Sequence, residues 1–175
     1  MSEDLRYPIG KFQWPDTVSA EDRARHIDTI ASAPARLSDA VSGLTDEQLD
    51  TPYRVGGWTV RQVIHHVPDS HMNSYVRFKL ALTENNPAVK GYDEAAWAML
   101  SDSVDTPVDI SLLLLDRLHK RWVALLRGMS DSDWKRTFHH SEHGALSLEK
   151  NLALYAWHGD HHIGHIESLR KRNGW

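Results

Sequence analysis

The strongest constraint on the fold of this chain is a helical repeat of apolar side chains, which recurs in four long stretches. The four stretches cover about residues 20–43, 59–84, 106–128 and 147–172. No stretch alternates apolar and polar residues for long enough to predict a β-strand of useful length. The sequence therefore predicts an all-α fold, a four-helix bundle with long connecting loops of about 20 residues.

Several residues mark where these helices begin or bend. Thr59 with Gln62 forms a capping box at the start of the second helix, and Ser147 is a good first residue for the last one. Pro34 lies inside the first helix and predicts a kink or a split, and Pro68 lies inside the second helix and predicts a bend.

The segments outside the helices are irregular. Residues 1–18 have no sustained period and predict an extended N-terminal arm. Residues 129–146 are polar and predict an irregular connection with a small hairpin at about 138–146.

Length and composition exclude several classes of protein. A chain of 175 residues predicts one domain covering residues 1–175. Lys and Arg number 20 against 24 Asp and Glu, giving a net charge of −4, so we expect no nucleic-acid partner. No apolar run approaches the roughly 18 residues of a membrane span, and the polar, acidic start predicts no secretory signal.

Histidine is the unusual residue of this composition. The chain has 12 histidines and no cysteine. Ten of them fall into three groups: His65, His66 and His71; His139, His140 and His143; and His158, His161, His162 and His165. Without cysteine, any transition-metal site must use imidazole and carboxylate ligands, which suit zinc, nickel, iron or manganese.

The last helix gathers four histidines on one side. At about 100° per residue, the third group shares an arc about 100° wide, and it contains two His-x-x-x-His pairs. Such spacing stacks two imidazoles one turn apart, so both can bind one ion. The second helix presents a polar stripe beside its apolar seam: Gln62, His66, Asp69, Asn73 and Arg77. One histidine from this helix with two from the last would make a three-histidine site with open positions, the pattern of catalytic metal sites.

Other residues receive more ordinary interpretations. The group at residues 139–143 lies in a polar loop and is expected to be solvated, although such a loop can cover a site. Asp69 and Asp160 are candidates for orienting the ligand imidazoles, and Arg77 for pairing with a substrate anion. We expect the tryptophans to be packing residues: Trp58, Trp97, Trp122, Trp134 and Trp157.

Six segments carry a resemblance to a known family. They are GWTVRQVIHHVPDSHMN (57–73), WHGDHHIGHI (157–166), YPIGKF (7–12), LDTPYR (49–54), YVRFK (75–79) and RNGW (172–175). Together they resemble the DinB superfamily of metal-binding four-helix bundles, and within it the YfiT group. That group is described as metal-dependent hydrolases and is linked to bacillithiol S-transfer.

The resemblance implies a metal site, an oligomeric state and a cellular location. By motif position it implies that His66, His158 and His162 hold one divalent ion per chain, zinc or nickel. It implies that His161 and His165 either support these ligands from behind or line the cleft. It also implies a homodimer located in the cytoplasm. The leading hypothesis is therefore a metal-dependent hydrolase acting on a small-molecule substrate.

Two alternatives share these ligands. The first is a low-molecular-weight-thiol S-transferase of the bacillithiol type, in which a thiol is the nucleophile in place of water. The second is a metal-binding stress protein without catalysis, because a fold does not fix a function. No residue of the sequence stands out as a dedicated general base.

Overall fold

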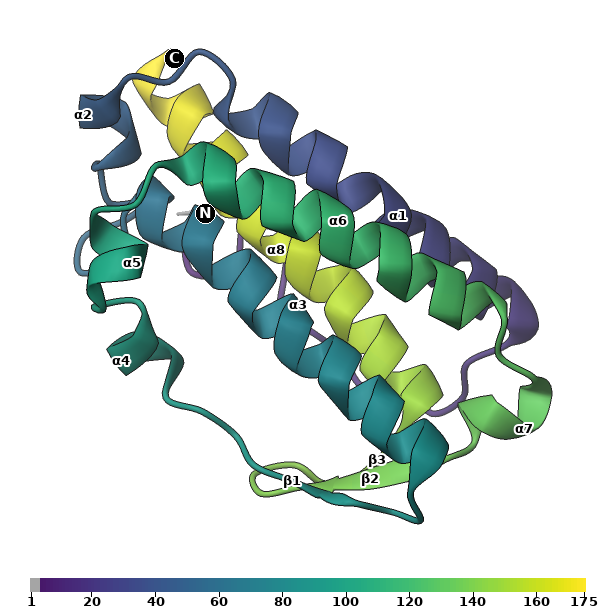
Figure 1. The fold of residues 1–175 in the computed structure, drawn as a ribbon. Helices are drawn as coiled ribbons and strands as arrows, with labels where there is room; N and C mark the ends of the chain where they lie inside the picture. The colour runs from purple at the N-terminus through teal and green to yellow at the C-terminus, as the bar shows by residue number, and fades with distance from the viewer. Residues whose placement is uncertain (1–3) are drawn as a thin grey trace.

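Four long helices lie side by side in the computed structural model, which describes residues 4–175 (Figure 1). The elements in chain order are α1 (Ala20–Val41), α2 (Asp46–Leu49), α3 (Val60–Thr83), β1 (Ala88–Val89), α4 (Glu94–Trp97), α5 (Ser101–Val104), α6 (Val108–Arg127), α7 (Asp131–Trp134), β2 (Thr137–His140), β3 (Gly144–Ser147) and α8 (Leu148–Asn173). None of the helices described is long and apolar enough to cross a membrane.

The arrangement of the long helices confirms the expected four-helix bundle. α1 packs mainly against α6 and α8, and α3 packs against the same two helices. α1 and α8 run in one direction and α3 and α6 in the other (Figure 1). The first connection therefore joins two helices on a diagonal of the bundle, and the second joins two parallel helices and must return along the bundle (Figure 1). This explains why these two loops are longer than in a simple up-and-down bundle.

The predicted start of α3 is confirmed in atomic detail. Thr59 Oγ1 accepts a hydrogen bond from the Gln62 backbone N–H at 3.1 Å, and Gln62 Oε1 accepts one from the Thr59 N–H at 3.0 Å. At the start of α8, Ser147 Oγ accepts from the Lys150 N–H at 3.4 Å. These caps satisfy backbone donors that have no partner inside the helix. They fix where the two histidine-bearing helices begin.

Neither internal proline breaks its helix, so of the kink or split expected at Pro34 the split is wrong. α1 continues through Pro34 and α3 through Pro68. Proline has no N–H, and the carbonyl four residues earlier loses its helical donor as a result. For Pro34 that carbonyl belongs to Ile30, which instead accepts a hydrogen bond from His119 Nδ1 at 2.6 Å.

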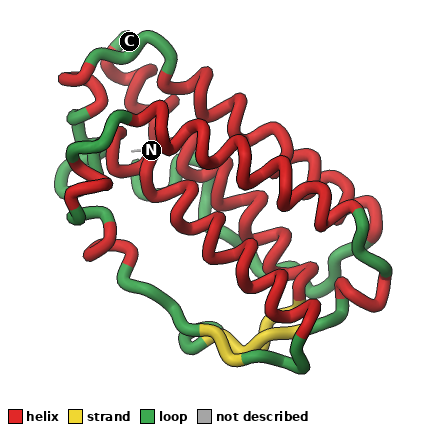
Figure 2. The backbone as a smooth tube through the Cα atoms, in the orientation of Figure 1, coloured by secondary structure: helices red, strands yellow, loops and turns green. Residues whose placement is uncertain are grey.

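Three short strands form a small sheet at one end of the bundle (Figure 2). β2 and β3 form the antiparallel hairpin that the sequence predicted. β1 adds a parallel pair with β2, with Ala88 opposite His139. β1 was not predicted, because two residues are too few to show a period.

The N-terminal arm is confirmed over its described residues. It runs along α8, where His165 Nε2 donates to the Arg6 carbonyl at 3.2 Å. Pro8 and Ile9 lie over Gly164, and a Cβ at that position would be 3.1 Å from Ile9 Cγ2. Glycine therefore allows the arm to approach the helix closely.

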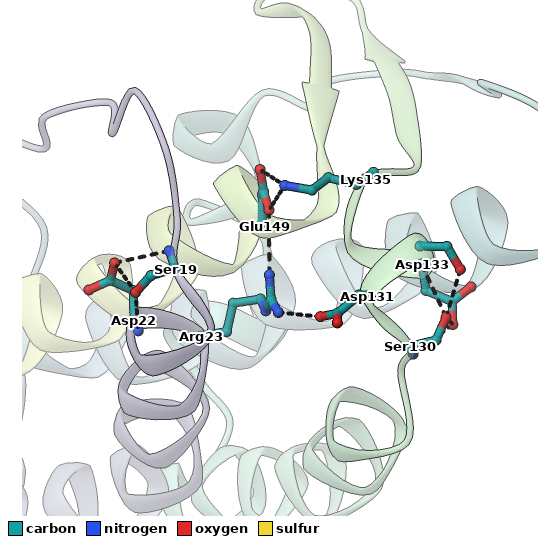
Figure 3. A network of polar contacts seen from close by, with 9 residues as sticks. Ser19, Asp22, Arg23, Ser130, Asp131, Asp133, Lys135 and Glu149 are labelled. Atoms are coloured by element: carbon teal, nitrogen blue, oxygen red, sulfur yellow. Dashed lines mark hydrogen bonds and ion pairs between the residues drawn. The ribbon is translucent and has the colours of Figure 1, made fainter.

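A polar network joins three elements next to the sheet (Figure 3). Arg23 of α1 contacts Asp131 of α7 and lies 3.9 Å from Glu149 of α8. Lys135 reaches the same Glu149 carboxylate at 3.0 Å. Glu149 is buried, and two cations compensate its charge.

The buried core consists of two apolar clusters with a polar layer between them. One cluster contains Phe78 and Trp122 with the first turns of α8, and the other contains Ile64 and Ile166. Along α3 and α8, the residues between these clusters include the buried histidines. The fold thus places imidazoles in the interior, where each needs a hydrogen-bond partner or a metal.

Candidate metal centre

α3 and α8 bring together the three histidines that the resemblance assigned to a metal. One ring nitrogen each from His66, His158 and His162 lies within 4.8 Å of the other two. The Nε2 atoms of His66 and His158 are 3.3 Å apart. Zinc–nitrogen bonds of about 2.0–2.1 Å at tetrahedral angles place two ligand nitrogens about 3.3–3.4 Å apart. The spacing of this pair therefore fits a shared ion.

Burial keeps these imidazoles neutral, as metal ligands must be. It lowers the pKa of His66 to about 4. Burial also holds the pKa values of His158 and His162 well below the ordinary histidine value, with further lowering from the neighbouring imidazoles. At neutral pH each ring therefore has one nitrogen with a free lone pair.

A chain of buried hydrogen bonds determines which nitrogen of His158 is free. It begins at the Ile30 carbonyl, which can only accept, so His119 Nδ1 carries the proton in that bond. His119 Nε2 must then accept, at 2.8 Å, from His71 Nδ1. His71 Nε2 accepts in turn, at 3.1 Å, from His158 Nδ1.

This direction of donation leaves Nε2 of His158 without a proton. That atom is the one that faces His66. We call the rings of His71 and His119, with the Ile30 carbonyl freed by Pro34, the histidine relay. The relay presents a lone pair to the candidate centre without using a carboxylate.

The relay corrects the expectation that Asp69 or Asp160 orients the imidazoles. Asp160 pairs instead with Arg36 at 2.6 Å. Asp69 forms no side-chain hydrogen bond with a described residue, and burial raises its pKa to about 6, with a further contribution from Asp102. Neither His71 nor His119 was predicted to take part in the site. The one available signal was the mid-helix Pro34, which leaves a carbonyl that needs a donor.

The other two histidines of α8 have different surroundings. The His161 ring stacks on Trp157 at 4.4 Å between centroids and lines the cavity described next. The His165 ring stacks on Tyr53 at 4.0 Å and binds the N-terminal arm through Arg6. His165 is therefore a packing and anchoring residue, while His161 faces the space in which a substrate would lie.

A cavity of about 330 Å³ adjoins the three candidate ligands. Its walls come from α3, α8, the segment after β1 and the β2–β3 hairpin. Besides the three candidate ligands and His161, they include Trp58, Ser70, Arg77, Tyr92, His140 and Trp157. Trp58 and Trp157 thus line the cavity, which corrects their interpretation as packing residues only. The Trp58 ring lies 4.7 Å from the ring of His66.

The hairpin covers this cavity, so the solvated interpretation is wrong for one of its histidines. His140 is 4% exposed, and its Nδ1 accepts from the Glu142 backbone N–H at 3.2 Å. His143 and His139 are exposed. Ligand atoms of His140, Glu142 and His143 also lie within 4.8 Å of one another, but two of these three residues are at the surface.

Comparison with known proteins gives consistent matches over the whole chain. The model of the DinB superfamily matches residues 29–166. A protein of Bacillus mycoides (strain KBAB4) is 56% identical over 173 residues, which cover 99% of each chain. A protein of Bacillus cereus (strain B4264) is 56% identical over 172 residues, 98% of this chain and 99% of that one. Both bear the name "Putative metal-dependent hydrolase".

A solved structure shows the same fold. YfiT from Bacillus subtilis is described as "a probable metal-dependent hydrolase with an unusual four-helix bundle topology". It superposes with a TM-score of 0.95 at 52% sequence identity, covering 98% of both chains. The likeness therefore includes both helices that carry the candidate histidines.

Proposed function

Because the chain belongs to the DinB superfamily, we propose that it is a hydrolase that depends on one divalent metal ion held by His66, His158 and His162. The observation that carries the proposal is the pair of Nε2 atoms 3.3 Å apart, one of them kept free of a proton by the histidine relay. The names of the relatives point to the same class of reaction.

Zinc or nickel is the ion that we propose for this site. Three neutral imidazoles are ligands of intermediate softness, which both ions accept. Three protein ligands leave coordination positions open, as in catalytic zinc sites. When bound, such an ion polarises the scissile group and makes water a nucleophile near neutral pH.

The residues of the chain supply the binding space for the substrate. The rings of Trp58 and Trp157 line the cavity beside the three histidines and offer apolar contact to a substrate. The hydroxyl of Ser70 lies 3.5 Å from His158 Nε2, so it can hydrogen-bond to a substrate at the centre. A small molecule fits this volume, and we propose a small-molecule substrate on that basis.

Turnover by metal-loaded protein tests the proposal. Metal-free protein is reloaded with zinc or nickel and assayed with 4-nitrophenyl esters and anilides, against the free ion as background. We expect hydrolysis that falls at least about 100-fold in His162→Ala, since that variant loses a ligand. His139→Ala is the matched control, because His139 is exposed and should leave the rate unchanged.

The same assay separates the alternatives. Conversion of an electrophile such as 1-chloro-2,4-dinitrobenzene only when cysteine or another small thiol is added would contradict hydrolysis and favour the S-transferase. Metal binding without turnover in either assay would contradict an enzyme and favour a metal-binding stress protein. The homodimer and the cytoplasmic location that the resemblance implies stay predictions.

A further inference from the structure

Arg77 is a buried cation on the face of α3 that carries His66. The two residues are 11 positions apart, which is three turns and about 20° on a helix. Arg77 is 8% exposed and lines the same cavity as the candidate ligands. A guanidinium so deeply buried normally has a carboxylate partner, because an isolated charge is costly to remove from water.

No carboxylate in residues 4–175 pairs with Arg77 within 4.0 Å. Its two hydrogen bonds are long: Nη1 donates to Tyr155 Oη at 3.4 Å, and Nη2 donates to the Lys90 carbonyl at 3.5 Å. Ordinary N–H···O bonds cluster near 2.9–3.0 Å. A guanidinium offers five N–H donors in a planar fork, so most of its hydrogen-bonding capacity is unused.

The groups that face Arg77 do not neutralise it. Burial lowers the pKa of His140, and the charge of Arg77 lowers it further, so this ring is neutral. Glu94 and Glu142 also line the cavity, but both are exposed and neither forms an ion pair with Arg77. Lys90 contributes its carbonyl oxygen and adds no negative charge. One wall of the cavity therefore carries a buried guanidinium that forms no ion pair with any described residue.

Arg77 is close enough to the three histidines for one small molecule to reach both. Tyr155 Oη, which contacts Arg77, lies 3.5 Å from Ser70 Oγ. That Ser70 oxygen is 3.5 Å from His158 Nε2. Three contacts of 3.4–3.5 Å thus link the guanidinium to the candidate centre, a separation of about 10 Å at most.

We propose that Arg77 binds an oxyanion of the substrate, a carboxylate or a phosphate, while the reactive end of the substrate lies at His66, His158 and His162. The substrate class is then an ester or amide of a small organic acid that keeps one free acidic group. The position of the reactive end rests on the proposed function. The anion site itself rests only on Arg77 and its surroundings.

Binding of simple acids tests the proposal without requiring turnover. Zinc-loaded protein is titrated calorimetrically with butyrate and with the dicarboxylates succinate, glutarate, adipate and suberate. Butyrate reports a carboxylate at the metal alone. A dicarboxylate of matching length should bind about 10- to 100-fold more tightly, since its second carboxylate gains a charge-assisted bidentate contact.

Two variants assign that gain to Arg77. Arg77→Met should remove it and leave butyrate binding unchanged, and the variant should fold because it removes a buried charge that forms no ion pair with any described residue. Lys79→Met is the matched control, because it removes an exposed cation of the same helix and should keep the gain. Equal affinity for butyrate and every dicarboxylate, or a gain that survives Arg77→Met, would overturn the anion site.

A measurement on metal-free protein separates this proposal from the metal-dependent function. Phosphate should raise the melting temperature of metal-free wild type and of Lys79→Met, but not of Arg77→Met. If the protein binds no zinc, this result still supports the anion site while the proposed hydrolase fails. If phosphate stabilises all three proteins equally, the anion site is wrong whatever the metal does.

Discussion

Replacing His71 by leucine should weaken metal binding although His71 is not a candidate ligand. His71 accepts from His158 Nδ1 at 3.1 Å and donates to His119 Nε2 at 2.8 Å. Leucine can do neither, so His158 loses the contact that keeps the proton on Nδ1 and leaves Nε2 free. Removing such an orienting partner typically lowers metal affinity about 10- to 100-fold, or about 1.4–2.7 kcal/mol.

The same change should also lower stability. His71 is 0% exposed and His119 is 1% exposed, so water cannot replace the two lost hydrogen bonds. Each buried group left without a partner costs about 1–3 kcal/mol, so His71→Leu should lose about 2–6 kcal/mol of unfolding free energy in the metal-free protein. Urea unfolding measures this loss, and competition for zinc with a coloured chelator measures the affinity.

Two further variants separate orientation from stability. His65→Leu is the matched control: His65 is also buried on α3, with hydrogen bonds to Ser111 at 2.7 Å and to the Thr106 carbonyl at 3.1 Å, but it contacts no candidate ligand. It should lose similar stability and keep the affinity of the wild type. His71→Gln retains an acceptor and a donor and should recover most of the affinity. If His71→Leu binds zinc as tightly as His65→Leu, the relay does not orient His158 and the reasoning is refuted.

Two predictions concern the pH dependence of stability. Burial raises the pKa of Asp69 to about 6, above its unfolded value. The charged carboxylate therefore opposes folding at pH 7.5, and this cost in stability disappears as the pH falls below about 4. Asp69→Asn should therefore stabilise the protein by about 1 kcal/mol at pH 7.5 and by almost nothing at pH 4; urea unfolding that shows no gain at pH 7.5 would contradict this. Burial lowers the pKa of His119 to about 4, below its unfolded value, so the unfolded chain takes up a proton at this ring at a higher pH than the folded protein does. The stability that depends on the neutral ring is therefore complete above about pH 6.5 and is lost as the pH falls towards 4. Metal-free wild type should lose about 1.4 kcal/mol per pH unit from this residue over that range, and His119→Gln should show a shallower loss, whereas equal slopes would contradict the assignment.

Local signals in the sequence predicted the long helices well. The capping box at Thr59 and the N-cap at Ser147 gave the starts of α3 and α8 within a residue, because these signals depend only on neighbouring positions. The spacing of His158 and His162 likewise required only the helical period. The choice of His66 over His65 came from the family resemblance, and the structure places His66 beside His158, while His65 faces Ser111 of α6.

The histidine relay could not be predicted in the same way. His71 and His119 lie 48 positions apart and meet only because α3 packs against α6. No spacing rule connects them: in the sequence His71 belongs to a cluster of histidines and His119 stands alone. Carboxylates commonly orient metal-bound histidines, which is why Asp69 and Asp160 were predicted in that role. In this fold Asp160 forms an ion pair with Arg36 instead. The burial of His140 was missed for a related reason: the hairpin is polar in sequence, and only its packing against the rest of the fold buries this one ring while its neighbours stay exposed.

The metal content of purified, tag-free protein tests the central claim most directly. Elemental analysis should find about one zinc or nickel ion per chain in the wild type and in His139→Ala. His66→Ala and His158→Ala should each lose that ion, because the two Nε2 atoms 3.3 Å apart come from different helices and neither helix alone supplies the site. Metal that persists at wild-type level in both variants, or a wild type that binds none, would contradict the account.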